Sequence, residues 1–312
     1  MKFGYFCNTT NWTHKPYHKL LDETKQITEY CDQNYWNSIW FTEHHFNHEG
    51  MESCTNPLML GADAAARTKN IRIGQAANVI TFHNPIRLAE DIATLDQLSK
   101  GRVEVGVARG VYGREAINLN KEADLKDQAK NFRLFAETLE ILKKAWSEKF
   151  FNHDGEFYTY PSPNYVWQHD MSPPSEEFMN MADSTMKKIS VLPKPYQNPH
   201  PPIHQVVDGI RSIEWAAENN INVIMWIPTV KALKIRFEAY KNKRSEVTKK
   251  NVPLGEGVTL VRDMFVADTM EEAKEKAGQH MVNYMKWVCH WRGLGNHTVS
   301  YTHLTLPTTP YV

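Results

Sequence analysis

Several features that mark particular classes of protein are scarce or missing in this sequence. Only four cysteines occur in 312 residues, and they form no CxxC pair, which argues against a disulfide framework and for reduced thiols in the cytoplasm. Lysine plus arginine equals aspartate plus glutamate, at 36 each, so the positive excess typical of nucleic-acid-binding proteins is lacking. No apolar run approaches the ~20 residues of a membrane helix, and no signal-peptide core is seen near residue 1. We therefore expect a cytoplasmic protein without a nucleic-acid or membrane partner.

The sequence does contain a regular alternation of short apolar runs and helical stretches. Strands are expected at residues 2–7, 38–46, 71–80, 102–108, 203–207, 221–227 and 257–267. Helices are expected at residues 17–34, 57–68, 85–100, 127–149, 211–219, 229–249 and 270–289. Several starts carry cap signals, such as proline after Asn56 and after Asn84, and Gly101 is a natural stop signal.

This alternation predicts the fold class. Repeated βα units favour a parallel sheet with helices outside it, and eight units would close a TIM barrel. Because seven units are counted, the predicted fold is an α/β TIM (β/α)8-type barrel that is truncated before its eighth βα unit. We assign residues 1–292 to this domain and interpret residues 293–312 as a non-family or disordered tail. Residues 151–202 are irregular, and an insertion of this length is expected to be a functional loop or a lid.

Candidate functional residues are sought beyond the carboxyl ends of the strands, where ligands bind in parallel α/β sheets. The most unusual group is Glu43-His44-His45-Phe46. Adjacent histidines can serve as a general base and an orienting group, but only one of them can face the barrel axis from a strand. Two other interpretations stay open. The histidines could only satisfy buried hydrogen bonds, or they could join His48 and Glu49 in a metal site, although no helical HExxH spacing is present.

Other strand ends carry residues suited to a flat, phosphorylated ligand. Arg109 could clamp a phosphate or stack on a planar ring, although a surface arginine beside a turn is an equal alternative. Gly209 and Ser212 follow the strand at 203–207, and a helix N-terminus there suits a phosphate. A βα turn that binds no ligand would have the same sequence pattern.

Two sets of apolar residues at strand ends have both a functional and a structural interpretation. The small pair Ala76-Ala77 would let a flat ligand lie against the backbone, with core packing as the default explanation. Phe6, Phe46 and Trp226 could line an apolar substrate pocket, although at strand positions such residues are more often simple core.

Together these residues resemble the bacterial luciferase-like family of flavin-dependent monooxygenases. The matching stretches are MKFGYF, WFTEHHF, NIRIGQAANVI, NPIRLAEDIATLDQLSKGRVEVGVARGVYG, PKPYQNPHPPI and IEWAAENN, and they reach from residue 1 to about residue 290. The chain is more similar to the catalytic α-type luciferase chain than to the β-type, because it retains the first histidine of the pair.

The resemblance implies a TIM barrel that binds reduced FMN and reacts it with O2. It implies a C4a-(hydro)peroxyflavin that oxygenates a small apolar organic substrate, such as an aldehyde, alkane or terpene. A separate flavin reductase would supply the reduced FMN, and a homo- or heterodimer is expected.

The resemblance also implies roles for individual residues. His44 falls on the family's catalytic histidine, with His45 beside it, and Ala76-Ala77 falls on a non-prolyl cis peptide beneath the flavin ring. The flavin-contacting loop and the phosphate-binding turn fall on Arg109, Gly110, Val111, Asp208, Gly209 and Ser212.

The sequence departs from the family pattern at Ala108, at Trp226, which replaces a small residue, and in its missing eighth βα unit, and three rival functions stay open. Ala108 stands where luciferase carries a reactive cysteine, which argues against identity with luciferase itself. The rivals are an F420-dependent hydride-transfer oxidoreductase of the same fold, a non-catalytic partner subunit, and a metal-dependent hydrolase that uses the His44–Glu49 cluster.

Overall fold

The computed structural model describes residues 1–226 and 229–291. The chain divides into two compact units, Met1–Val261 and Arg262–Val312, and each is described by itself. The predicted tail, residues 293–312, lies outside the described residues.

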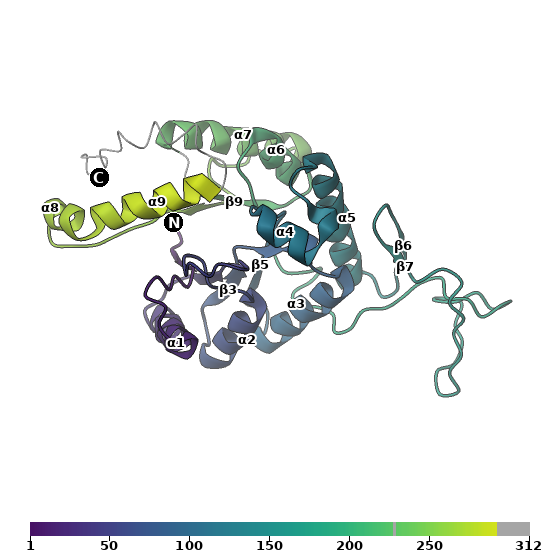
Figure 1. Cartoon of the computed structure of the whole chain (residues 1–312). Coiled ribbons are helices and arrows are strands. Elements are labelled where there is room, and N and C mark those ends of the chain that lie inside the picture. Colours follow the sequence, from purple (N-terminus) through teal and green to yellow (C-terminus); the bar gives the residue numbers. More distant parts are fainter. Residues whose placement is uncertain (227–228, 292–312) are drawn as a thin grey trace. The chain divides into compact units, whose positions relative to one another are not determined.

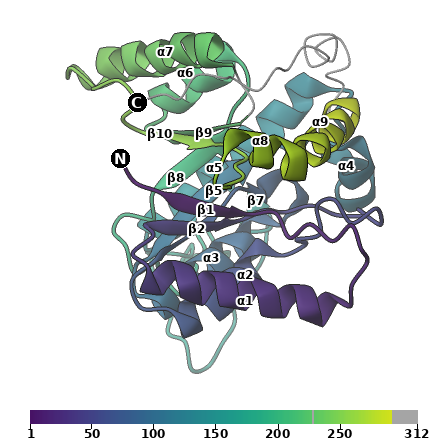
Figure 2. The ribbon, with the colours of Figure 1, turned by 90° about the vertical axis from the view of Figure 1, so that its left-hand side faces the viewer.

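A parallel sheet forms the centre of the first unit (Figures 1 and 2). Its strands, in spatial order, are β1 (Gly4–Cys7), β2 (Ser38–Phe41), β3 (Arg72–Gln75), β5 (Val103–Ala108), β8 (Ile203–Val206), β9 (Asn222–Trp226) and β10 (Val258–Val261). Each neighbouring pair along this path is parallel, and the short strand β4 (Asn78–Val79) also pairs with β5. The seven strands make a nearly closed barrel. In the described residues, no pairing of β1 with β10 joins its two edges.

Helices connect the strands, and α1 and α2 pack against the outer side of β2 (Figure 2). The α-helices of this unit are α1 (Tyr17–Gln33), α2 (Pro57–Arg67), α3 (Pro85–Ser99), α4 (Gly113–Leu119), α5 (Gln128–Ser147), α6 (Ile210–Glu218) and α7 (Val230–Thr248). Two short 3-10 turns occur at Ile80–Phe82 and Lys121–Ala123. The second unit contains α8 (Met270–Ala273), a π-helical turn (Lys274–Gly278) and α9 (Gln279–Trp291). The predicted TIM-barrel class and its seven βα units are thus confirmed.

The two faces of the strands have different partners. Side chains that point outward, including Ile39, Ile73, Val105 and Val223, join the helices in one buried apolar cluster. The inward face carries more polar and aromatic side chains than the outward face. On it, the strand register places Phe6 beside Trp40, Trp40 beside Gly74, and Gly74 beside Glu104.

A polar layer fills part of the barrel interior. The Glu104 carboxylate pairs with the Arg72 guanidinium and, at 2.8 Å, with Nε2 of His204. The His204 ring meets the Trp40 indole edge-on at 5.1 Å between centroids. The Arg72 and His204 side chains therefore compensate the half-buried Glu104 carboxylate.

The predicted cap signals are confirmed. The Asn56 side chain accepts a hydrogen bond from the Met59 N–H, and that of Asn84 accepts from the Ile86 and Arg87 N–H groups. Helix α3 ends with Lys100 and Gly101 in left-handed conformations, as the stop signal predicts.

Three strand boundaries and one helix differ from the prediction. The strand expected at 38–46 ends at Phe41, and the one expected at 257–267 ends at Val261. The strand expected at 71–80 is interrupted by a cis peptide between Ala76 and Ala77, which separates β3 from β4. Helix α4 was not predicted, because its seven residues are too few for a periodic apolar pattern.

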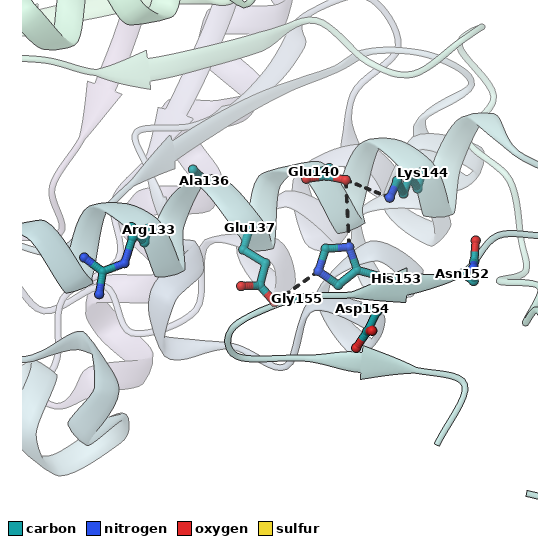
Figure 3. Close-up of a pocket in the computed structure, with 9 residues that line it drawn as sticks. All are labelled: Arg133, Ala136, Glu137, Glu140, Lys144, Asn152, His153, Asp154 and Gly155. Carbon is teal, nitrogen blue, oxygen red and sulfur yellow. Dashed lines mark hydrogen bonds and ion pairs between the residues drawn. The ribbon is translucent and has the colours of Figure 1, made fainter. Parts of the chain in front are cut away.

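The insertion at residues 151–202 connects the end of α5 to the start of β8. Within it, β6 (His153–Asp154) and β7 (Thr159–Tyr160) form an antiparallel hairpin. The Glu137 carboxylate of α5 binds His153 and accepts hydrogen bonds from the Phe157 and Tyr158 N–H groups. Figure 3 shows His153 between Glu137 and Glu140, in a pocket that none of the predicted site residues lines.

The lid role expected for this segment stays a prediction. A connection from a helix to the following strand starts and ends on the side of the strands' amino ends, whereas ligands bind at their carboxyl ends. The segment's contacts lie on both sides of the barrel. Lys194 donates to the carbonyls that end α5, and Gln197 binds Asp96 of α3. The hairpin instead contacts groups beyond the carboxyl ends of β4 and β5, because Tyr158 packs against a buried cluster that includes Ala116 of α4, and the Asn84 amide donates to the Tyr160 hydroxyl at 3.4 Å. Among the described residues, no helix combines the length and apolarity needed to cross a membrane.

The close approach of β2 and β3 generates a stability prediction. A Cβ added at Gly74 would lie 2.2 Å from the Trp40 ring, whereas one added at Gly113 would meet nothing within 4 Å. We expect Gly74→Ala to lower the free energy of unfolding by about 1–3 kcal/mol through overpacking. Gly113→Ala is the matched control, measured by urea denaturation. Equal stabilities of the two variants would contradict the described packing.

Candidate functional site

The predicted site residues follow the carboxyl ends of adjacent parallel strands. His44 follows β2, Ala76 and Ala77 follow β3, Arg109 follows β5, and Asp208 follows β8. Since these strands are neighbours and run in the same direction, the residues gather at one rim of the barrel.

His44 lies between two buried carboxylates. Its Nε2 is 3.5 Å from Oε2 of Glu52, and its Nδ1 is 3.5 Å from Oε1 of Glu115. The exposed fractions of Glu52 and Glu115 are 2% and 0%. The Tyr112 hydroxyl donates to the same Oε2 of Glu52 at 2.7 Å, and its ring lies 5.4 Å from the imidazole. This arrangement orients the His44 ring and offers an acceptor to each ring nitrogen.

His45 has separate partners. Its Nε2 is 3.0 Å from Oε1 of Glu43, and its ring lies beside those of Phe46 and Phe82. Its backbone N–H donates to Glu115 at 2.7 Å. Since β2 ends at Phe41, the strand alternation expected for this pair does not apply, and the two rings differ in surroundings because of their separate partners.

Glu43 is the centre of a buried hydrogen-bond cluster. Burial alone would raise its pKa, but hydrogen bonds from His45 and His83 outweigh burial and lower the pKa to about 2. The Val79 N–H donates to its Oε2 at 2.7 Å and contributes in the same direction. His83 is 2.8 Å from Oε1. Burial would lower the pKa of His83, but the hydrogen bond and charge of Glu43 outweigh this and raise it. The cluster therefore ties the end of β2 to the segment after the cis peptide.

The residues of the metal hypothesis do not converge. Glu49 is bound by the Arg114 guanidinium, at 2.9 Å and 3.2 Å for its two oxygens. The His48 side chain is 86% exposed. In the described ranges, no group of three or more His, Cys, Asp or Glu side chains is placed to hold a metal ion.

The segment after β3 has the backbone conformation that the family resemblance implies. The Ala76-Ala77 peptide is cis, so this prediction is confirmed. Gly106 of β5 approaches it closely, since a Cβ there would lie 1.6 Å from the Gln75 carbonyl oxygen. The Asn78 amide donates to the Gly106 carbonyl at 3.1 Å, which fixes the two segments together.

Arg109 is held by its backbone while its side chain lies over an aromatic ring. Its carbonyl accepts from Thr81 and from Asn131, at 3.2 Å and 3.1 Å. The guanidinium lies 5.8 Å from the centroid of Phe132. Burial lowers its pKa, and the charge of Asp208 acts in the opposite direction.

The two residues after Arg109 continue the predicted flavin-contacting loop. Gly110 has φ of +88°, and a Cβ there would lie 3.0 Å from the Phe82 ring, so this position favours glycine. Val111 is half-buried.

The turn after β8 is open. Asp208 and Gly209 are exposed, and Ser212 is half-buried in the first turn of α6. Gly209 precedes that helix without a side-chain cap, and a Cβ there would meet nothing within 4 Å. Because the first N–H groups of a helix lack intrahelical partners, this turn can accept a phosphate.

The predicted pocket residues have different surroundings. Phe6 is half-buried and aligned with Trp40 in the sheet. Phe46 is 51% exposed and lies against His45. Trp226 is half-buried at the end of β9. Their role in a substrate pocket stays a prediction.

Sequence reasoning missed Glu52 and Glu115. Glu52 lies in an irregular loop, and Glu115 lies in the unpredicted helix α4. They meet His44 only through the fold, so no local spacing marks them. The one usable signal was their place after the ends of β2 and β5.

Comparisons with known proteins identify the family of this chain. A family model described as "Luciferase-like monooxygenase" matches residues 1–305. The oxygenase component of flavin-dependent trigonelline monooxygenase from Acinetobacter baylyi is 27% identical over 290 residues, covering 91% of this chain and 70% of that protein. An alkanal monooxygenase alpha chain from Photorhabdus luminescens is 27% identical over 253 residues, covering 79% of this chain and 59% of that protein.

Solved structures share the fold. The oxygenating constituent of 3,6-diketocamphane monooxygenase from Pseudomonas putida, in complex with FMN, aligns with a TM-score of 0.72 at 22% identity. That alignment covers 89% of this chain and 72% of the other. An F420-dependent secondary alcohol dehydrogenase aligns with a TM-score of 0.61 at 17% identity, covering 83% and 67%. At these identities the likeness shows the fold alone.

The Glu43 cluster predicts how stability depends on pH. The pKa of Glu43 falls from 4.5 to about 2 on folding, so its stabilising contribution is complete above about pH 4.5 and is lost as pH falls toward 2. We expect Glu43→Gln to be less stable than wild type at pH 7 by about 3 kcal/mol. This difference should narrow between pH 4.5 and pH 3 in urea unfolding. A difference in unfolding free energy between the two proteins that does not change with pH would contradict an ionised Glu43 in the folded state.

Proposed function

Because the chain belongs to the family of luciferase-like monooxygenases, we propose that it is a flavin-dependent monooxygenase. It would use reduced FMN and O2 to oxygenate a small apolar organic substrate. The observation that carries the proposal is the gathering, at one rim, of a carboxylate-flanked histidine, a cis Ala76-Ala77 peptide, a half-buried arginine and an open helix N-terminus.

The residues present fit a flavin mononucleotide. The open turn at Gly209 and the first N–H groups of α6 would hold the phosphate, with the Ser212 hydroxyl as a further donor. Arg109 supplies a positive charge at the neighbouring strand end, between this turn and the cis peptide. The Ala76-Ala77 backbone carries only methyl side chains, so a flat ring can approach it. When bound, reduced FMN supplies the electrons that activate O2.

His44 is the group best placed to move a proton. Its ring nitrogens each face a carboxylate at 3.5 Å, so a proton on Nε2 or Nδ1 has a nearby acceptor while the ring stays oriented. We assign His44 as the general acid or base at the reacting atoms. We assign His45 to the Glu43 hydrogen-bond cluster, which holds the end of β2 next to His44.

Partners follow from the same assignment. We propose that a separate reductase supplies reduced FMN, since the trigonelline relative is named an oxygenase component. We also propose a homo- or heterodimer, supported by the exposure of Met59 on α2 and Leu98 on α3, at 71% and 61%. A cytoplasmic location stays a prediction from cysteine usage.

Two rival functions share the fold. An F420-dependent oxidoreductase is kept as the alternative because a structure of that kind aligns with this chain. A non-catalytic partner subunit is the other, and the retention of His44 with both its carboxylates argues against it.

Replacing His44 tests its catalytic role. We expect His44→Ala to bind reduced FMN as wild type does but to lower the rate of substrate oxygenation by about 10²–10⁴-fold, the usual contribution of a general acid or base. The assay follows product from a panel of aldehydes and ketones with a flavin reductase present. His48→Ala, at an exposed position in the same segment, is the matched control. Unchanged turnover in His44→Ala would instead support the partner-subunit function.

A charge placed in the α6 turn tests phosphate binding. We expect Ser212→Asp to weaken binding of reduced FMN by at least about 10-fold, because a carboxylate would repel the phosphate. Binding of reduced riboflavin, which lacks the phosphate, should change less than about 2-fold. Anaerobic fluorescence titration measures both. Equal losses for the two ligands would place the phosphate elsewhere.

A further inference from the structure

We propose that Glu52 is a positioning residue that acts through His44, in a Tyr112–Glu52–His44 relay that holds and orients the proton-bearing ring. The inference rests on the proposed function for its meaning in turnover. The pairing itself can be measured without any flavin.

The relay begins with a carboxylate that is almost completely removed from solvent. Glu52 is 2% exposed, and its Oε2 accepts the Tyr112 hydroxyl at 2.7 Å and faces Nε2 of His44 at 3.5 Å. A buried carboxylate is costly unless it is paired and hydrogen-bonded. Here the hydroxyl supplies the hydrogen bond and the imidazole the opposite charge when it is protonated, so Glu52 and His44 stabilise each other.

The loop that carries Glu52 is fixed to the strand end. The His44 N–H donates to the Cys54 carbonyl at 2.7 Å, and the Tyr17 hydroxyl donates to the Ser53 carbonyl at 2.9 Å. The Thr10 hydroxyl donates to the Met51 carbonyl at 3.0 Å. These bonds hold both sides of Glu52, so its carboxylate has little freedom to leave the imidazole.

Glu115 and Glu52 face different nitrogens of the His44 ring, so the two carboxylates have different roles. Oε1 of Glu115 is occupied by the His45 N–H at 2.7 Å and lies 3.5 Å from Nδ1 of His44. Only a doubly protonated imidazole can donate from both nitrogens at once. Glu52 is therefore the carboxylate that faces Nε2, while Glu115 lies 3.5 Å from Nδ1 on the other side of the ring.

Other charged groups near this ring have partners of their own. Glu43 is bound by His45, His83 and the Val79 N–H. Arg114 is bound to Glu49. Glu52, Glu115 and Tyr112 are titratable groups that lie against the His44 ring. Because Glu52 lies 3.5 Å from Nε2, removing its charge should act on His44 directly.

The first test is an NMR titration of the histidines in the full chain without cofactor, with the His44 signal assigned by its loss in His44→Gln. We expect Glu52→Gln to shift the His44 titration to lower pH by about one unit, since a carboxylate at this distance favours the charged imidazole. Glu49→Gln makes the same charge change in the same loop and should leave the titration in place. An unchanged His44 titration in Glu52→Gln would overturn the inference.

The second test separates positioning from a merely structural role. In the oxygenation assay, Glu52→Gln should lower kcat by about 10-fold with KM unchanged, and should shift the pH–rate profile as in the NMR titration. In a His44→Ala background the same substitution should change kcat by less than 2-fold, because its effect passes through the imidazole. Equal losses in both backgrounds would overturn the inference. If Glu52→Gln shifts the His44 titration but the chain neither binds nor oxidises reduced FMN, the proposed function is contradicted. The interaction between Glu52 and His44 would still be supported by the shifted titration.

Discussion

A carboxylate removed from water must be paired, and three such carboxylates determine how this rim is built. Glu43, Glu52 and Glu115 are at most 3% exposed, and each is compensated by a histidine, a hydroxyl or a backbone N–H group. Their partners come from different strand ends, so satisfying the charges also brings the strand ends together. The same pairing that makes burial tolerable orients the two histidines.

The barrel supplies the frame for these pairs. Glu43 follows β2 and binds the segment after β3 through Val79 and His83. Glu115 lies in α4, beyond β5, and binds back to the β2 end through the His45 N–H. Three neighbouring strand ends are therefore joined by side chains as well as by the sheet. A flavin lying across this rim would meet groups whose positions are already determined.

Much of this frame could be predicted from the sequence, because it depends on local patterns. Apolar periodicity indicated all seven βα units, and the Asn-Pro pairs marked the starts of α2 and α3. The cis Ala76-Ala77 peptide followed from the family resemblance rather than from any local rule. Glu52 and Glu115 could not be predicted, because their sequence positions are 8 and 71 residues from His44 and no spacing rule links them to it. The expectation that residues 151–202 cover the site rested on the length of this loop alone. The order of elements, from α5 to β8, determines where that segment starts and ends, but not which residues its hairpin contacts.

The central claim is that this rim binds reduced FMN through residues from separate strands, and the most direct test is calorimetric titration under anaerobic conditions. The full chain is titrated with reduced FMN and, in parallel, with reduced F420. The account predicts one reduced FMN bound per chain, with affinity at least about 10-fold higher than for reduced F420. Tighter binding of F420, or binding of neither, would contradict it.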